Sequence, residues 1–311
     1  MIQRRRLRIL PEAAGAWLTW CIVPLLPRRA VVALSRGLGA LAWRFSRRDR
    51  RISEANLALV LGETHAPVEW LAIGKASFQQ VALTLLDLFW FSRWTESRYR
   101  RYVQVDARFR SVLGEVPLVG VTGHIGNWEI LRAACGMEGV PMTAVAMPVK
   151  NPIVDRMLGQ LRQRTGADAV PRAGAVRSLL RCLREGRITG LVLDQNTLPS
   201  EGGVFVPFFG LPVPVSNVAG LLGVKTGAKL LVGAAMADSH GVYRVVLKDP
   251  VSPEGKTPEA LTAEVTGLLE ELVRDYPQHW LWSYKRWRYY RPDDPVERYP
   301  YYASAKPSQL R

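Results

Sequence analysis

The chain has 311 residues, of which 48% are hydrophobic and 22% are charged. These proportions are those of an ordinary globular protein and exclude a disordered chain, a collagen and a polytopic membrane protein. The formal net charge is +15; residues 1–51 carry +10 of it and residues 284–311 carry +4, which leaves +1 on the residues between them. Such basic ends favour an anionic partner, which could be nucleic acid, an acidic protein or an anionic membrane surface.

Two short apolar segments lie among the N-terminal arginines. Residues 13–26 contain Trp17 and Trp20, and residues 30–43 follow a break at Pro27. Each segment has about 14 residues, whereas a membrane-spanning helix needs about 20. Apolar helices with flanking arginine and embedded tryptophan are typical of helices that lie among lipid headgroups. We therefore predict that residues 1–50 form basic, membrane-associating helices; a transmembrane span, or ordinary packing against the core, is the alternative.

The cysteines and histidines form no recognisable site. The three cysteines include no C-x-x-C pair, and the four histidines include no H-E-x-x-H pattern. A disulfide framework and a zinc site are therefore not indicated. The chain also lacks a G-x-x-x-x-G-K phosphate loop, which argues against ATP-driven chemistry. We expect no cofactor and no metal.

The rest of the chain alternates between apolar strands and amphipathic helices, after a helical pattern over residues 52–95. This alternation predicts an α/β domain at residues 51–290, with a largely parallel central sheet flanked by helices, and a basic tail at residues 291–311. In such sheets the active site lies on loops beyond the carboxyl ends of the strands. The predicted strands are 118–122, 142–147, 188–193, 229–235 and 243–247, and the predicted helices are 128–135, 152–164, 174–185, 217–226 and 258–276.

One such loop, with the sequence V-T-G-H-I-G-N-W-E over residues 121–129, carries residues suited to acid–base chemistry. Two glycines permit a tight turn, and Asn127 is a good N-cap for the helix that follows. His124 then lies at the strand end, and Glu129 lies in the first helical turn, where negative charge is favoured. A carboxylate on one imidazole nitrogen leaves the other nitrogen able to accept a proton from an alcohol or amine. The loop alone also fits a structural histidine and a capping glutamate.

The loop sequence G-H-x-G-N-W-E resembles the H-x4-D/E motif of the glycerolipid acyltransferase superfamily. Its G-N-W-E form is similar to the lipid A biosynthesis (late) acyltransferase branch of that superfamily. Further ordered matches extend the resemblance from about residue 50 to about residue 290. These matches are R-x-x-x-x-N-L at 51–57, K-N-P-I-V-D at 150–155 with Arg162 and Arg164, L-D-Q at 193–195 with G-V-F-V-P-F-F-G at 203–210, and W-L-W at 280–282 with R-W-R at 286–288.

The resemblance implies a membrane-associated acyltransferase that moves a fatty acyl chain from a thioester to a hydroxyl of a glycolipid of the lipid A precursor type. It implies that His124 is the general base and that Glu129 is its orienting partner. No serine or cysteine nucleophile lies beside this pair, so direct attack by a substrate hydroxyl is favoured over a covalent intermediate. The acyl donor would be a thioester of acyl carrier protein or of coenzyme A, and both donors are anionic enough to suit a basic surface. The location implied is the bacterial inner membrane, with the active site on its cytoplasmic face.

Substrate-binding residues are expected around this pair. Arg162, Arg164 and Lys150 are candidates for binding substrate phosphates, although basic residues at a helix end are favoured in any case. Asn127, Asp194 and Gln195 are candidate polar walls, and the last two could equally be loop anchors. Backbone N–H groups near Phe209 and Gly210, or around Gly126, are candidate oxyanion donors. Phe205, Phe208 and Phe209 could line an acyl slot or simply belong to the core.

Several alternatives stay open at this point. The acceptor could instead be a phosphatidylinositol mannoside, an aminolipid or a phospholipid, and the chain could be a non-catalytic membrane-binding homologue. The Trp–Arg segment at residues 280–288 could be an amphipathic clamp on the membrane or ordinary packing with arginines that reach to solvent. A nucleic-acid binder is disfavoured because the chain shows no finger, helix-turn-helix or aromatic ribonucleoprotein motif.

Overall fold

A computed structural model describes residues 14–140, 142–146, 151–163, 168–171 and 174–305. Its centre is a seven-stranded sheet with the strand order β1-β9-β8-β2-β5-β3-β4. Strands β8, β2, β5, β3 and β4 are mutually parallel, β9 is antiparallel to β8, and β1 is parallel to β9. The strands are β1 (Val103–Gln104), β2 (Leu118–Thr122), β3 (Met142–Ala146), β4 (Asp168–Pro171), β5 (Ile188–Val192), β8 (Lys229–Ala237) and β9 (Tyr243–Leu247).

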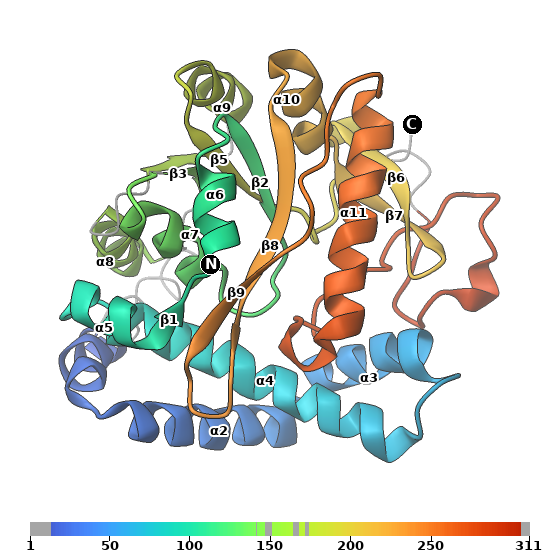
Figure 1. The fold of residues 1–311 in the computed structure, drawn as a ribbon. Helices are drawn as coiled ribbons and strands as arrows, with labels where there is room; N and C mark the ends of the chain where they lie inside the picture. The colour runs from blue at the N-terminus through green and yellow to red at the C-terminus, as the bar shows by residue number, and fades with distance from the viewer. Residues whose placement is uncertain (1–13, 141, 147–150, 164–167, 172–173, 306–311) are drawn as a thin grey trace.

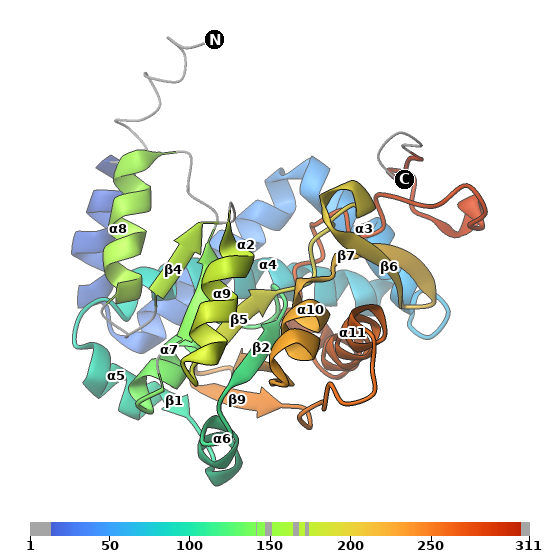
Figure 2. The same ribbon diagram turned by 90° about the horizontal axis from the view of Figure 1, so that it is seen from above.

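Helices cover both faces of this sheet and one of its ends (Figures 1 and 2). Figure 1 shows α2 and α4 lying across the end toward which β8 runs, and α10 at the opposite end. The helices are α2 (Arg28–Phe45), α3 (Arg47–Leu61), α4 (Pro67–Trp90), α5 (Thr95–Tyr102), α6 (Ala107–Leu113), α7 (Trp128–Met137), α8 (Pro152–Gln163), α9 (Ala175–Arg184), α10 (Val218–Thr226) and α11 (Pro258–Asp275), and residues 14–22 are also helical.

The strands separate two hydrophobic cores because successive side chains of a strand point to opposite faces. On β8, Leu230 and Val232 belong to the core formed with α9, α10 and α11. Leu231 and Ala235 belong to the other core, which α2, α4, α6 and α7 close. Burial on both faces explains why the parallel strands read as continuous apolar runs in the sequence.

The α/β class and the largely parallel sheet predicted from the sequence are therefore confirmed. Several parts of the pattern were not anticipated, among them the strands β1 and β4 and the helices α5 and α6. The helical stretch 52–95 is divided between α3 and α4 at residues 62–66, and a two-stranded antiparallel sheet of β6 (Gly203–Phe208) and β7 (Leu211–Ser216) lies outside the main sheet. Prolines at 207, 212 and 214 obscure the strand pattern of this hairpin, since proline cannot donate to a strand ladder.

The N-terminal helix α2 packs on α4 along one face and leaves an apolar stripe on the other. Gly39 makes the close approach possible, because a Cβ there would lie 2.3 Å from the Cα of Gln79. On the outer face, four exposed apolar side chains follow one another at helical spacing. They are Leu34, Leu38, Leu41 and Phe45, and we call them the α2 stripe. In the parts of the chain that the structure describes, no helix is long and apolar enough to cross a membrane.

Candidate active site

His124 and Asp194 meet because they follow the ends of neighbouring parallel strands. Strands β2 and β5 pair with Thr122 opposite Val192. His124 and Asp194 each lie two residues further along the chain, at the carboxyl edge of the sheet where parallel-sheet active sites are found. The Nδ1 atom of His124 lies 2.8 Å from Oδ1 of Asp194.

Asp194 is held by three donors. Besides the imidazole, its Oδ2 accepts hydrogen bonds from the backbone N–H of His124 at 2.7 Å and from the indole Nε1 of Trp280 at 3.0 Å. Asp194 and Trp280 are both buried. A buried carboxylate with this many donors is stable as an anion and has a fixed orientation. Sequence reasoning gave Asp194 only a wall or anchor role and did not anticipate the indole donor.

The loop that carries His124 needs glycine at two positions. Gly126 has φ of +59°, in the left-handed region, and a Cβ there would lie 2.2 Å from the carbonyl oxygen of Ala235. At Gly123, a Cβ would lie 3.1 Å from the carboxylate of Asp194. Asn127 then caps α7 as predicted, since its Oδ1 accepts from the backbone N–H groups of Glu129 and Ile130 at 3.1 Å.

The two partners shift each other's pKa. Burial by itself would lower the pKa of His124, but the charge and hydrogen bond of Asp194 outweigh it and raise the pKa above the ordinary value of 6.5. Burial would raise the pKa of Asp194, but the contacts with His124 and Trp280 outweigh it and lower the pKa. The pair therefore favours an ionised Asp194 and an imidazole that is a stronger base than usual.

The other ring nitrogen of His124 is available for chemistry. A carboxylate can only accept, so Nδ1 of His124 carries the proton and Nε2 of the neutral ring is the basic nitrogen. Within the described part of the chain Nε2 has no protein partner, while the ring lies edge-on to Trp128, with the ring centroids 4.8 Å apart. His124 and Trp128 both line a cavity of about 640 Å³.

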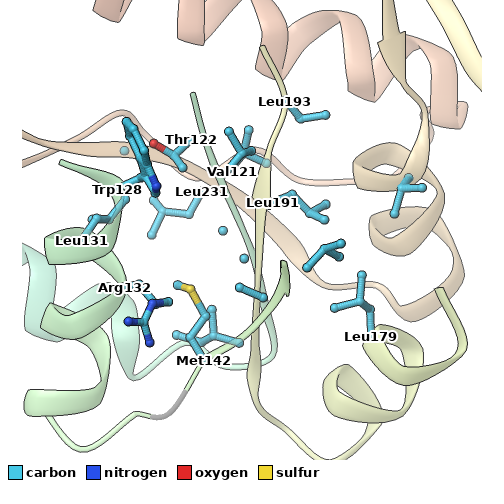
Figure 3. Close-up of a pocket in the computed structure, with 18 of the residues that line it drawn as sticks. Val121, Thr122, Trp128, Leu131, Arg132, Met142, Leu179, Leu191, Leu193 and Leu231 are labelled. Atoms are coloured by element: carbon cyan, nitrogen blue, oxygen red, sulfur yellow. The ribbon is translucent and has the colours of Figure 1, made fainter. Parts of the chain in front are cut away.

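This cavity extends from His124 along the sheet and is mostly apolar. Figure 3 shows Leu131, Arg132 and Met142 on one side of it and Leu179 on the other. Its floor includes a row of small residues, because Ala144 on β3 pairs with Gly190 on β5, which pairs with Gly120 on β2. A Cβ on Gly190 would lie 2.5 Å from the sulfur of Met142. The side chain of Met142 therefore occupies the space above Gly190, beside the cavity that both residues line.

Glu129 lies in the same cavity as His124, in the first turn of α7. Its Oε2 accepts a hydrogen bond from Nε of Arg132 at 3.0 Å, and both side chains are largely buried. The carboxylate that the structure describes on Nδ1 of His124 is that of Asp194, whereas Glu129 forms an ion pair at the cavity wall.

The remaining predicted residues have different surroundings. Gln195 lines the cavity. Phe209 and Gly210 form the turn between β6 and β7 and are not among the described lining residues. The backbone N–H of Phe209 bonds to Glu270 and that of Gly126 bonds to the carbonyl of His279, so both groups already have acceptors.

The candidate phosphate-binding residues cannot be placed in the site. Lys150 and Arg164 lie outside the described residues, as does the side chain of Arg162. Their proposed phosphate contacts stay predictions.

The Trp–Arg segment is part of the protein core. Trp280, Trp282, Arg286 and Trp287 are all fully buried. The guanidinium of Arg286 donates to Oδ1 of Asn196 at 3.0 Å and faces the ring of Phe208. Of the two interpretations left open by the sequence, these side chains therefore support packing, although the arginine does not reach solvent. Phe208 is fully buried in the same cluster.

No group of three or more His, Cys, Asp or Glu side chains in the described residues could hold a metal ion. The described site residues are a base and its carboxylate partner beside an apolar cavity.

Comparisons with known proteins show which family the chain resembles. The bacterial lipid A biosynthesis acyltransferase family matches residues 1–289. A lipid A biosynthesis lauroyltransferase from Escherichia coli K12 is 27% identical over 301 residues, which cover 91% of this chain and 95% of that protein. A lipid A biosynthesis acyltransferase from Haemophilus influenzae is 27% identical over 151 residues, which cover 47% of this chain and 45% of that protein.

Proposed function

The chain belongs to the bacterial lipid A biosynthesis acyltransferase family, and on this premise we propose that it transfers a fatty acyl chain from a thioester to a hydroxyl of a lipid A precursor. The observation that carries the proposal is the contact between a buried Asp194 and a half-buried His124 that lines an apolar cavity. The acyl donor would be a thioester of acyl carrier protein or of coenzyme A.

The reaction would proceed by direct attack. Nε2 of His124 takes the proton of the acceptor hydroxyl while that oxygen attacks the thioester carbonyl carbon. When the tetrahedral intermediate collapses, the carbon–sulfur bond breaks and the imidazolium returns its proton to the departing sulfur. Asp194 fixes the tautomer and stabilises the imidazolium between these steps, and such general acid–base catalysis contributes about 10²–10⁴-fold.

The two carboxylates of the site then have distinct roles. Asp194 orients His124, since its oxygens contact both Nδ1 and the backbone N–H of that residue. Glu129 contributes negative charge at the cavity wall, where it offsets the positive charge that develops on the imidazole during attack. Its ion pair with Arg132 holds the carboxylate in place.

The cavity is the proposed site of the acyl chain. Its volume of about 640 Å³ lies within the range of roughly 300–1,000 Å³ typical of small-ligand sites. Side chains such as Leu118, Leu131 and Met142 offer hydrocarbon contacts, and the small residues Gly120, Gly190 and Ala144 line its floor. This location replaces Phe205 and Phe209 as the proposed acyl slot.

The end of the sheet that carries the catalytic loop is also the end that faces α4 and α2. The hydroxyl of Thr84 on α4 donates to the carbonyl of Gly126 at 3.2 Å. The α2 stripe and the exposed arginines Arg29 and Arg44 lie on the outer helix of this layer. Apolar side chains with flanking arginines suit a helix that lies among anionic headgroups. We therefore propose that the protein rests on an anionic membrane with α2 in the interface, so that a lipid acceptor reaches His124 from the membrane side.

The proposal can be tested with the purified full chain in anionic mixed micelles. The assay follows acyl transfer to a lipid A precursor from acyl carrier protein and coenzyme A thioesters, with phosphatidylinositol mannoside and phospholipid as alternative acceptors. His124→Ala should abolish transfer, whereas His240→Ala, which changes an exposed histidine in the β8–β9 turn, should not. Transfer that survives in His124→Ala, or its absence from wild type with every acceptor, would contradict the proposal.

A further inference from the structure

A chain of buried polar contacts leads from the N-terminal helix to the catalytic loop. The guanidinium of Arg28 on α2 forms an ion pair with Asp87 on α4, in which Nη2 lies 3.0 Å from Oδ2. The hydroxyl of Tyr243, at the start of β9, donates to the same Oδ2 at 2.5 Å. Nδ2 of Asn127 donates to the Tyr243 oxygen at 3.0 Å. All four side chains are buried, so the chain is shielded from water.

The order of these groups fixes the direction of every hydrogen bond. An ionised carboxylate can only accept, so the single proton of the Tyr243 hydroxyl is committed to Asp87. The Tyr243 oxygen can then only accept from Asn127, which must present its NH₂ group and not its carbonyl. The carbonyl oxygen of Asn127 is thereby directed at the first N–H groups of α7.

Charge and burial keep this arrangement in one state. Burial opposes the charge of Arg28, but Asp87 outweighs it and raises the pKa of the guanidinium. Burial, followed by the charge of Asp87, raises the pKa of Tyr243 well above its ordinary value. Arg28 also donates to the carbonyl of Gly241 from Nε at 3.0 Å and from Nη2 at 2.7 Å, which ties α2 to the β8–β9 turn. Figure 1 shows this turn reaching α2.

The far end of the chain is the loop that carries the catalytic base. Asn127 follows His124 by three residues, and its backbone N–H bonds to the carbonyl of Ala235 on β8. The residues that it caps, at the start of α7, include Glu129, which lines the cavity. A change in the orientation of the Asn127 amide would therefore shift both the helix start and the loop, and small displacements of catalytic groups cost large factors in rate.

We propose that Tyr243 is a positioning residue for acyl transfer: its hydroxyl, oriented by the Arg28–Asp87 ion pair, fixes the Asn127 amide and thereby the loop that carries His124. The catalytic consequence rests on the proposed function, whereas the structural part does not. The N-terminal helix α2 is then a component of the catalytic framework as well as the proposed membrane-facing element.

The first test is Tyr243→Phe in the full-length protein, since this change removes only the hydroxyl. We expect kcat to fall about 3- to 10-fold, the factor that corresponds to one lost hydrogen bond, while KM stays within about twofold. Backbone amides of Glu129 and Ile130 should exchange with solvent faster than in wild type. Tyr99→Phe is the matched control, because the buried Tyr99 hydroxyl contacts the carbonyl of Ala134 on the same helix, away from the loop. It should leave kcat and the exchange of these two amides unchanged.

The second test uses Asn127→Asp, which keeps a good N-cap but replaces the NH₂ donor by an acceptor. Because the Tyr243 proton is committed to Asp87, the new carboxylate finds no donor there, and we expect kcat to fall about 10- to 100-fold. In the Asn127→Asp, Tyr243→Phe double variant the opposing hydroxyl oxygen is gone, so the combined loss should be smaller than the product of the two single losses. The single Asn127→Asp variant also serves as the test if Tyr243→Phe fails to fold.

The outcomes separate this inference from the proposed function. Absence of acyl transfer in wild type would contradict the proposed function. The exchange of the Glu129 and Ile130 backbone amides with solvent would still test whether Tyr243 positions the loop. Unchanged kcat and unchanged exchange in Tyr243→Phe would overturn the inference. It would also be overturned by an equal effect of Tyr99→Phe, or by losses that simply multiply in the double variant.

Discussion

The Oδ1 atom of Asp194 lies 2.8 Å from Nδ1 of His124, although 70 residues separate them in the chain. The contact follows from strand pairing, because each residue is the second one beyond an end of the β2–β5 pair. The sheet therefore determines the distance between the base and its carboxylate, and a rigid sheet holds such a pair more accurately than a mobile loop.

Replacing Asp194 by asparagine should lower kcat by about 10²–10⁴-fold, because the amide can no longer stabilise the imidazolium. The substitution preserves side-chain volume, so the buried site keeps its packing. Steady-state kinetics in micelles measure the loss, and the melting temperature checks the fold. A decrease smaller than about threefold, the effect of an ordinary hydrogen bond, would argue against an orienting role for Asp194.

The pH dependence of kcat/KM should show an acid limb that reports on His124. The base must be neutral to accept a proton, so activity rises with pH through the pKa of the folded enzyme. That pKa is raised above 6.5 by Asp194, which puts the midpoint of the limb above 6.5. In Asp194→Asn the raising charge is gone while burial still lowers the pKa, so the midpoint should move to lower pH. If the midpoint in Asp194→Asn is the same as in wild type, the acid limb does not report on the His124–Asp194 pair.

Glu129→Gln should lower kcat by about 10- to 100-fold, because negative charge near the developing imidazolium is lost. The midpoint of the acid limb should also move to lower pH, because a charge that stabilises the imidazolium raises the pKa of His124, but it should move less than in Asp194→Asn, since Asp194 is the group in contact with the ring. Glu138→Gln is the control at the other end of α7, where Glu138 pairs with Arg110 at 2.9 Å, and it should have little effect. If Glu129→Gln instead moves the limb as far as Asp194→Asn does, Glu129 is the orienting carboxylate.

The sequence predicted the elements of this site better than their arrangement. Apolar runs located β2 and β5, and the residues after each run included His124 and Asp194. Their contact depends on strand order, because β3 and β4 come between β2 and β5 in the chain but lie beyond β5 in the sheet. Local periodicity contains no information about that order. A nearby carboxylate, Glu129, was therefore the natural partner to propose from sequence.

The sequence pattern also did not predict which charged side chains are buried. Arg28 and Arg286 occur in basic, tryptophan-containing segments that predict exposed arginines at a membrane surface. Arg28 is instead buried against Asp87, and Arg286 against Asn196 and Phe208. Their partners lie at least 59 residues away in the chain. Only the tertiary fold shows which arginines are neutralised in the core and which reach the surface.

Filling the floor of the cavity should change the preferred acyl chain. Ala144→Leu adds three carbons at a position that pairs with Gly190 and lines the cavity. The ratio of kcat/KM for long to short thioesters should fall about 10-fold or more, since hydrophobic pockets discriminate by about 1–3 kcal/mol per methylene. Ala58→Leu, on the exposed face of α3, is a control for added bulk. Equal losses for all chain lengths would argue that the acyl chain lies elsewhere.

Membrane binding should depend on the α2 stripe. In Leu41→Ser combined with Phe45→Ser, two apolar side chains that are 56% and 71% exposed are removed from the proposed interface. Burial of such a side chain in lipid contributes about 1.5–3 kcal/mol, so partitioning into anionic vesicles should fall about 100-fold or more. Val224→Ser changes an exposed apolar residue on α10, at the opposite end of the sheet, and should leave partitioning unchanged (Figure 1). Because neither stripe residue lines the cavity, kcat with micellar substrate should be retained. Vesicle co-sedimentation at several ionic strengths measures the partitioning, and equal binding of the stripe variant and wild type would show that another surface contacts the membrane.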